Sequence, residues 1–228
     1  MSARKVLAAK YAVGLAQQRL TPLDEIDRIV GGKETLELAD EIAAHAITLV
    51  RNDAQLLPLN LPPKATIFNL AITNGDDRLF VTQPFVATLA RAGLKVVTMV
   101  LDDRSSEAEV KKALDLAGNA DLVIASLYGR VRSGQARSVA LPAPGAKALE
   151  TLIDRKTPIV GISFGNPYLL SSFPKLQTYL VAYGDMQSLQ EAAAQALLGQ
   201  SDITGRLPIS LPGLYPSGTG IQLPANKK

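Results

Sequence analysis

The polar residues of this 228-residue chain that could bind a ligand lie in five short segments, each of which follows a run of apolar residues. Their amide, carboxylate and guanidinium groups can hydrogen-bond to hydroxyl groups or anions, and their tyrosine rings can stack on a flat ligand face. The segments span residues 73–78, 102–104, 128–134, 164–168 and 183–185. The candidate binding residues in them are Asn74, Asp76, Arg78, Tyr128, Arg130, Arg132, Asn166, Tyr168 and Asp185.

Simpler roles are open for the same residues. Tyrosines at strand ends commonly close a core. Arg130 and Arg132 alternate along an extended segment, so their side chains are expected to point to opposite sides. The backbone amides of residues 74–76 suit an anion, but neither a G-x-G-x-x-G nor a G-x-x-x-x-G-K-[ST] pattern is present. The adjacent Asp76 and Asp77 would repel a phosphate, which favours a helix-capping role for them.

Composition excludes several kinds of site. The sequence contains no cysteine and one histidine, His45, so we expect no disulfide, no thiolate or multi-histidine metal site and no cofactor. The net charge is +3 and the basic residues are scattered, which argues against a nucleic-acid partner. The apolar runs are too short or too interrupted to cross a bilayer, so no membrane partner is expected. No signal-type stretch begins the chain, and its compartment stays open.

Apolar, β-rich runs alternate with helical patterns, which predicts an α/β fold. The strands are expected at residues 65–72, 95–101, 121–127, 158–163 and 178–182, and the helices at 35–49, 80–92, 107–117, 145–155 and 188–197. Near-continuous apolar strands between helices indicate a three-layer α/β/α sandwich with a mostly parallel sheet of about six strands and flavodoxin-like topology. A short closing run, residues 207–211, is a candidate for one antiparallel edge strand. In such sheets, ligands bind at the carboxyl ends of the strands, where the five polar segments lie.

Three motifs occur in a fixed order along the chain. They are AITLVRNDAQLLPL at residues 46–59, SFGNPY at 163–168 and GQSDITGRLPISLP at 199–212. Together they resemble the C-terminal domain of family 3 glycoside hydrolases, near the two-domain β-N-acetylhexosaminidase branch, and the resemblance covers most of the chain. It implies a helix of a missing catalytic barrel at residues 1–15, a linker at 16–33, the α/β domain at 34–212 and an extended tail at 213–228. The implied partners are the barrel of the same enzyme and a carbohydrate substrate.

The resemblance also implies where the catalytic groups belong. Retaining hydrolysis needs a nucleophile and an acid/base group, and in this family the nucleophilic aspartate belongs to the barrel. β-Glucosidases of the family are expected to supply an acid/base glutamate from the loop after the third strand. The matching residues 127–141 contain no acidic residue and three arginines, Arg130, Arg132 and Arg137, which cannot shuttle protons at neutral pH. In the N-acetylglucosaminidase branch the acid/base is a histidine on a barrel loop.

We therefore expect this chain alone to be inactive, with its work being to support a barrel and shape the sugar pocket. Two alternatives stay open. One is a stand-alone sugar- or anion-binding module of flavodoxin-like topology without catalysis, and the other is a purely structural interaction domain. The sugar, the linkage and the oligomeric state do not follow from the sequence.

Overall fold

The computed structural model describes residues 2–62, 64–134 and 139–226, and it divides into two compact units, Met1–Ala39 and Asp40–Lys228. The first unit contains helix α1 (Ser2–Ala12), a 3-10 turn η1 (Leu23–Glu25) and the short helix α2 (Ile26–Ile29). Helix α3 (Lys33–Ala46) begins in the first unit and ends in the second. No described residue of α1 is buried, although the helix carries Val6, Leu7 and Tyr11.

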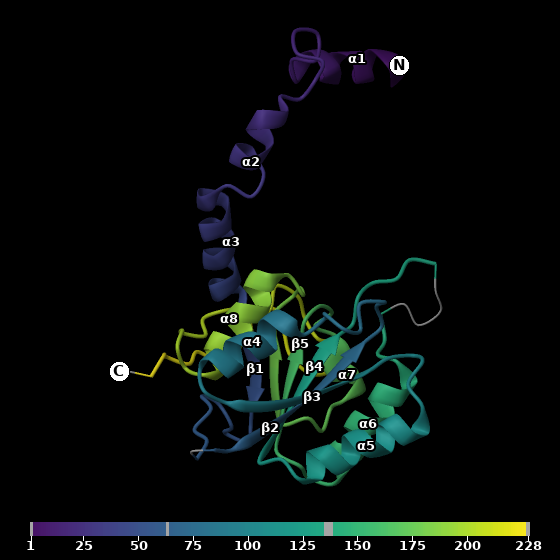
Figure 1. Cartoon of the computed structure of the whole chain (residues 1–228), viewed down its shortest axis with the longest axis vertical. Coiled ribbons are helices and arrows are strands. Elements are labelled where there is room, and N and C mark those ends of the chain that lie inside the picture. The colour runs from purple at the N-terminus through teal and green to yellow at the C-terminus, as the bar shows by residue number, and fades with distance from the viewer. Residues whose placement is uncertain (1, 63, 135–138, 227–228) are drawn as a thin grey trace. The chain divides into compact units, whose positions relative to one another are not determined.

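The second unit is built on a six-stranded sheet (Figure 1). Its strands are β1 (Thr48–Asn52), β2 (Thr66–Thr73), β3 (Lys95–Leu101), β4 (Leu122–Tyr128), β5 (Ile159–Ser163) and β6 (Thr178–Val181). Their order is β1-β6-β5-β4-β2-β3, and every neighbouring pair is parallel except β1 with β6. Without β1, this is the flavodoxin-like strand order. The expected fold class is confirmed.

Helices cover both faces of the sheet, which makes three layers (Figure 1). Helices α4 (Gln83–Arg91) and α8 (Gln187–Leu197) pack on one face, and α5 (Glu107–Gly118), α6 (Ala143–Asp154) and α7 (Leu169–Ser172) pack on the other. Successive residues of the central strand β2 serve alternate faces: Ile67 and Ala71 pack with α4 and α8, and Phe68, Leu70 and Ile72 pack with α5 and α6. Because both faces are covered, the parallel strands read as continuous apolar runs.

The antiparallel edge strand is β1, and this corrects two expectations. Helix α3 ends at Ala46 instead of continuing to Leu49, and the next residues form β1. Thr48, Leu49 and Val50 are all buried, and β1 pairs with β6, which places Thr48 opposite Val181. β-Branched residues that pack on both sides of a sheet favour this conformation over a further helical turn.

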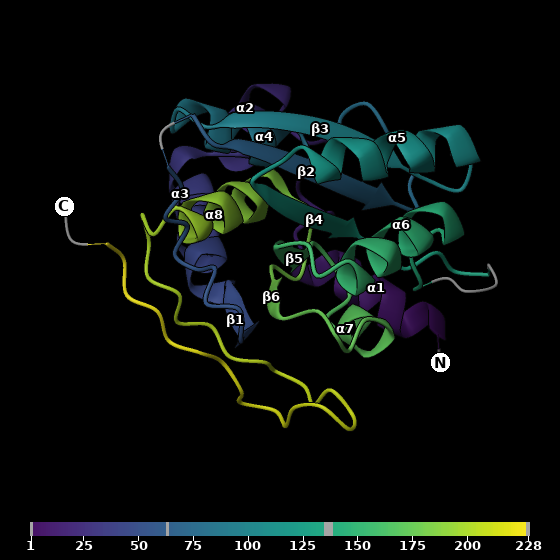
Figure 2. The same ribbon diagram turned by 90° about the horizontal axis from the view of Figure 1, so that it is seen from below.

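Residues 207–211 do not form the expected strand. Pro208 and Pro212 have no N–H group to donate to a sheet ladder, and the described tail takes over the pairing instead. Leu207 N donates to Thr219 O at 2.8 Å, and Ile221 N donates to Leu49 O at 2.8 Å. Figure 2 shows the tail running alongside β1. The tail therefore covers backbone groups that an open sheet edge would expose.

Arg51, in the RND motif, fixes this tail to the sheet. Its Nε donates to the hydroxyl of Tyr215 at 2.7 Å, its guanidinium lies 5.4 Å from the centre of that ring, and Nη1 donates to Pro174 O at 2.7 Å. Asn52 closes the following turn, because its side chain both donates to and accepts from the backbone of Leu57. The motif at the start of the domain thus holds its last segment.

Candidate functional site at the carboxyl edge of the sheet

The loops after the parallel strands meet at one edge of the sheet, and the strand order reverses between β2 and β4. Ligands bind at such a switch point in open α/β sheets. Asn74, after β2, joins the two loops: its Oδ1 accepts a hydrogen bond from Arg130 N at 3.0 Å, and its Nδ2 donates to Arg130 O at 2.8 Å. Asn74 is buried. Its carboxamide therefore continues the pairing of β2 and β4 beyond the ends of the strands.

The side chain of Arg130 links three loops through two carboxylates. Nη1 and Nη2 donate to Oδ1 and Oδ2 of Asp77, each at 2.7 Å, and Nε donates to Oδ2 of Asp185 at 2.5 Å. These hydrogen bonds lower the pKa of Asp77 and raise that of Arg130. A Cβ atom on Gly75 would overlap Nη1 of Arg130, so a side chain at this position would displace the guanidinium from its carboxylate partners. Asp77, Arg130 and Asp185 form a unit that we call the edge clamp.

A buried polar network supports the edge clamp from below. Tyr128 is fully buried, and its hydroxyl donates to Oε1 of Gln190 at 3.3 Å, while Nε2 of Gln190 donates to Asp185 O at 2.7 Å. Burial raises the pKa of the Tyr128 phenol. Its ring stacks on Phe164 with centroids 4.8 Å apart. The structure therefore places Tyr128 in the core beneath the edge, where it holds α8 and the loop after β6.

A second ionic group joins the loops after β2 and β3. Nη1 of Arg78 donates to Oδ1 of Asp102 at 3.3 Å and its Nη2 pairs with Glu109, while Nε and Nη2 of Arg104 donate to Oδ2 of Asp102 at 3.0 and 2.7 Å. Burial pushes the pKa of Asp102 upward, but the hydrogen bonds from Arg104 and the charges of Arg78 and Arg104 outweigh burial and lower it. Arg78 therefore faces its own domain.

The remaining candidates lie nearer to solvent. Asp76 is exposed, and Nη1 of Arg132 has one ion pair, with Oδ2 of Asp103 at 3.6 Å. In the loop after β5, Tyr168 N donates to Oδ1 of Asn166 at 3.0 Å, and the Tyr168 ring is exposed. Arg137 lies outside the described residues. A shallow cavity of about 340 Å³ borders Asp76, and the rest of its lining comprises Asp77, Arg78, Leu79, Phe80 and Arg104.

Large apolar side chains are exposed on the same loops. Leu79 and Phe80, after β2, are 79% and 64% exposed. Apolar side chains on the other edge loops are exposed as well, namely Val131, Val139, Tyr168 and Met186. Exposed apolar groups gathered in one place mark an interaction surface. We call these six residues, which lie on the loops after β2, β4, β5 and β6, the apolar rim.

Two carboxyl groups of the described edge are unsuited to general acid catalysis. The pKa values of Asp77 and Asp102 are lowered by their arginine partners, so these groups do not hold a proton at neutral pH. No acidic residue occurs in 129–142. Within the described ranges, no group of three or more metal-ligating side chains gathers, and no helix is long and apolar enough to cross a membrane.

The sequence predicts most of these residues at the carboxyl edge of the sheet, but it does not single out three residues that pair with them. Asp77, Asp102 and Arg104 each hold an ionic group together, although none was among the candidate binding residues. Asp102 carries a usable signal, because it directly follows the apolar run of β3 and is buried. Nothing in the sequence separates Asp77 from its neighbour Asp76.

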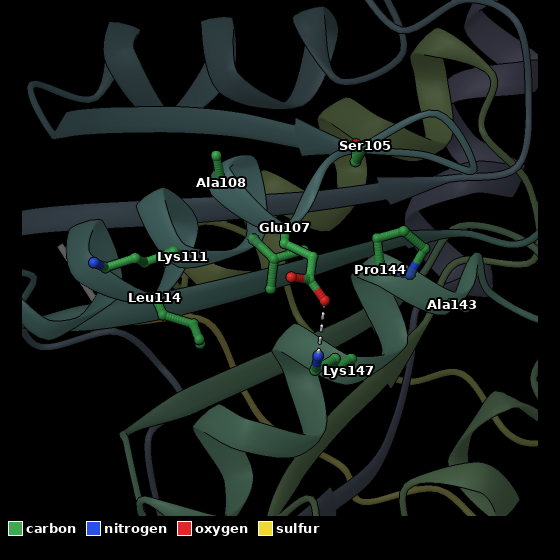
Figure 3. A pocket seen from close by; sticks show the side chains of 9 residues that line it. Ser105, Glu107, Ala108, Lys111, Leu114, Ala143, Pro144 and Lys147 are labelled. Carbon is green, nitrogen blue, oxygen red and sulfur yellow. Dashed lines mark ion pairs between the residues drawn. The ribbon is translucent and has the colours of Figure 1, made fainter.

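A second cavity differs from the edge clamp in character. It lies between α5 and α6, has a volume of about 600 Å³, and is lined largely by small or apolar side chains. Figure 3 shows Glu107 and Lys147 facing each other across it, and their charged atoms are 3.9 Å apart. Both of these charged side chains are largely exposed to solvent. The groove therefore lacks the fixed polar groups that give the edge its order.

The lowered pKa of Asp77 predicts a pH dependence of stability. Its carboxylate is stabilised by Arg130, so its contribution is complete above the ordinary pKa of 3.8 and is lost as the pH falls below that value. We expect Asp77→Asn to lower the free energy of unfolding by about 1 kcal/mol at pH 7, because the pair is partly exposed. The difference from the wild type should shrink below about pH 4. Urea unfolding of the wild type and the variant at pH 7 and pH 3 measures this difference in the free energy of unfolding. A difference at pH 3 as large as that at pH 7 contradicts the stabilisation of the Asp77 carboxylate by Arg130.

Comparisons with known proteins agree with this architecture. A model described as "Glycosyl hydrolase family 3 C-terminal domain" matches residues 47–217. A "Beta-N-acetylglucosaminidase/beta-glucosidase" of Cellulomonas fimi is 26% identical over 90% of this chain and 37% of its own length. The solved structure of "Beta-glucoside phosphorylase BglX" is 27% identical with a TM-score of 0.71, covering 91% of this chain and 37% of that one.

One further solved structure shares the fold. It is a family 3 β-N-acetylglucosaminidase from Paenibacillus sp. str. FPU-7, with 22% identity and a TM-score of 0.72 over 92% of this chain and 39% of that one. A "Putative beta-xylosidase" of Formosa agariphila matches at 24% identity over 31% of its length. The chain thus spans about a third of the length of the curated relatives it matches. The similar structures belong to larger enzymes.

Proposed function

The chain belongs to the glycosyl hydrolase family 3 C-terminal domain family, and from this premise we propose that it is the non-catalytic domain of a retaining β-N-acetylhexosaminidase. In this role it packs on a catalytic barrel and shapes the rim of the sugar pocket. The observation that carries the proposal is the loop after β4. Where a β-glucosidase of the family is expected to supply its acid/base glutamate, this loop has Arg130, which is bound to Asp77 and Asp185.

A guanidinium stays protonated in proteins, so it cannot donate and accept the proton that glycoside hydrolysis requires. The acid/base group must then come from elsewhere in the enzyme, as in the N-acetylglucosaminidase branch. The relatives support a partner domain, because this chain spans 37% of the Cellulomonas fimi enzyme. The apolar rim provides a surface on which that domain can pack.

We extend the proposal to the domain boundaries. Residues 1–15 are the last helix of the barrel, 16–33 are the linker, 34–212 are the α/β domain and 213–228 are a tail. The exposed apolar residues of the first unit, among them Val6, Leu7 and Val13, support this division, because such side chains are normally buried against a partner. The bridge between Ile221 and Leu49 gives the tail a structural role on the sheet.

A second candidate function is a binding module without catalysis. The shallow cavity beside Asp76, Phe80 and Arg104 favours it, since ligands of flavodoxin-like sheets bind at this edge. This candidate requires no barrel. It predicts that the chain alone binds a sugar or a small anion with measurable affinity.

The test is an assay of the chain alone and of the chain preceded by the region encoded upstream. We expect the chain alone to hydrolyse neither an aryl β-N-acetylglucosaminide nor an aryl β-glucoside above background. With a barrel restored in cis, the N-acetylglucosaminide should be the preferred substrate. Turnover by the repurified chain alone contradicts the proposal, and so does an upstream region without a barrel. Sugar binding by the chain alone would favour the binding module.

A further inference from the structure

The donors of Arg130 are almost fully used inside the domain. A guanidinium has five N–H groups. Nε and Nη1 each donate to one carboxylate oxygen, and Nη2 serves both Asp77 and Asp185. At most one N–H remains for a ligand. Arg130 is thus not arranged as a substrate-binding group, although its loop lies where a ligand would bind.

We propose that Arg130 is a positioning residue, which fixes the loops after β2, β4 and β6 in one arrangement and so presets the rim of the sugar pocket. This inference rests on the proposed function for its role in the enzyme. The geometry of the edge clamp within the domain stands independently of that function. The proposal assigns Arg130 an effect on how the rim is ordered, not on proton transfer.

Each member of the edge clamp is held from a second side. Asn74 binds both backbone groups of Arg130, and Gln190 of α8 binds the backbone oxygen of Asp185. Asp77 begins the turn toward α4, where Phe80 N and Val81 N both donate to its backbone oxygen. The backbones of both aspartates therefore stay on neighbouring loops when the guanidinium is removed. Two like charges would remain close together, which favours opening of the loops.

The edge clamp also sets where the apolar rim points. Phe80 is three residues after Asp77, Val131 is the neighbour of Arg130, and Met186 is the neighbour of Asp185. Each of these exposed side chains thus lies within three residues of one member of the edge clamp. A surface ordered before binding pays less conformational entropy when a partner docks. Loss of the edge clamp should therefore weaken recognition more than it changes the chemical step.

Arg132 provides the comparison within the same loop. Among the described residues it has one ion pair, at 3.6 Å with an exposed aspartate, whereas Arg130 has bidentate contact with one carboxylate and a further contact with another. Both arginines have partly exposed side chains. Removing Arg132 deletes the same charge from the same loop but breaks a longer ion pair to one exposed carboxylate, instead of the short contacts with two carboxylates that Arg130 makes. Arg132→Ala is therefore the matched control for loop order.

The first measurement is hydrogen exchange of the isolated chain. We expect Arg130→Ala to speed exchange of the backbone amides in residues 74–80, 129–134 and 184–187 by roughly tenfold or more, with the sheet amides unchanged. Arg132→Ala should change these rates by less than about twofold. Arg130→Lys should rescue only part of the protection, because an ammonium group lacks the planar fork. If Arg130→Ala does not fold, Asp185→Asn removes the negative charge of one link isosterically and, by weakening it, should speed exchange at 129–134 and 184–187.

The second measurement uses the whole enzyme. We expect Arg130→Ala to raise KM by roughly ten- to a hundredfold while kcat changes less than about threefold, since a factor of ten corresponds to about 1.4 kcal/mol. Arg155→Ala, at the exposed end of α6, is the control. Unchanged exchange in both Arg130→Ala and Asp185→Asn overturns the edge clamp itself. Faster exchange with unchanged KM leaves the edge clamp in place and overturns its role in the enzyme.

Discussion

Replacing Phe164 by alanine is expected to lower the free energy of unfolding of this chain by about 3–5 kcal/mol, the usual range for removing a buried phenylalanine. Phe164 follows β5 directly and is 1% exposed. Its ring is stacked on Tyr128 at 4.8 Å and meets the edge of Phe85 at 5.4 Å. The substitution therefore opens a cavity between α4 and the sheet and removes two ring contacts as well.

The size of the effect follows from where Phe164 lies. Phe164 stacks on Tyr128, and the Tyr128 hydroxyl donates to Gln190, so the phenylalanine ring connects β5 to the polar network beneath the edge. A loss of about 3–5 kcal/mol is a large part of the total stability of an ordinary domain, about 5–15 kcal/mol. We expect Phe164→Leu to cost less than Phe164→Ala, because leucine fills part of the cavity.

Urea unfolding of the purified chain measures the prediction, and Phe80→Ala is the matched control. Phe80 is 64% exposed, so its removal should change the free energy of unfolding by less than about 0.5 kcal/mol. Equal losses of unfolding free energy for the two variants would mean that Phe164 is not the centre of a cluster with Phe85 and Tyr128. A loss below about 1 kcal/mol for Phe164→Ala would mean that the core collapses around the missing ring.

The parallel part of the fold follows from the sequence because of how its strands are buried. Residues 95–101 were expected as a strand, and β3 spans Lys95–Leu101. Helices cover both faces of the sheet, so the strands leave continuous apolar runs between helical patterns. Their bounds are set locally, by the residues at which those runs begin and end.

The edge strand β1 could not be found in the same way. Residues 47–50 continue the apolar pattern of α3, so local periodicity favours a longer helix. These residues form a strand instead because they pair with β6, more than a hundred residues later in the chain. The opposite error occurred at 207–211, where a strand-like run pairs only with the tail. In both cases a distant segment outweighs local preference.

The candidate site was predictable as a place but not as a set of contacts. Parallel strands bring their carboxyl ends to one edge, so the loops with Asn74, Arg130 and Asp185 had to be neighbours. Adjacent residues nevertheless have different roles: Asp77 binds Arg130, and Asp76 is exposed. Such choices depend on loop conformations that carry no periodic signal. The same loop conformations decide that Arg130, and not Arg132, binds two carboxylates of its own domain.

Removing two highly exposed side chains of the apolar rim should weaken docking without changing stability. Under the proposed function, Leu79 and Phe80, which are 79% and 64% exposed, become buried against the barrel. Burying a large apolar side chain contributes about 1.5–3 kcal/mol, and a few such residues dominate most interfaces. We therefore expect the double variant Leu79→Ala, Phe80→Ala to weaken binding of the chain to a separately produced barrel by roughly a hundredfold or more.

Calorimetric titration of the barrel with the wild-type and double-variant chains measures this loss. Urea unfolding of the free variant should show almost no change, because both side chains are largely exposed in the isolated domain. Ile221→Ala, on the tail over β1, is the control for an exposed apolar residue away from the edge. Affinity within about twofold of the wild type would show that the barrel packs elsewhere. The carboxyl edge would then face solvent, and the exposed apolar groups on its loops would need another partner.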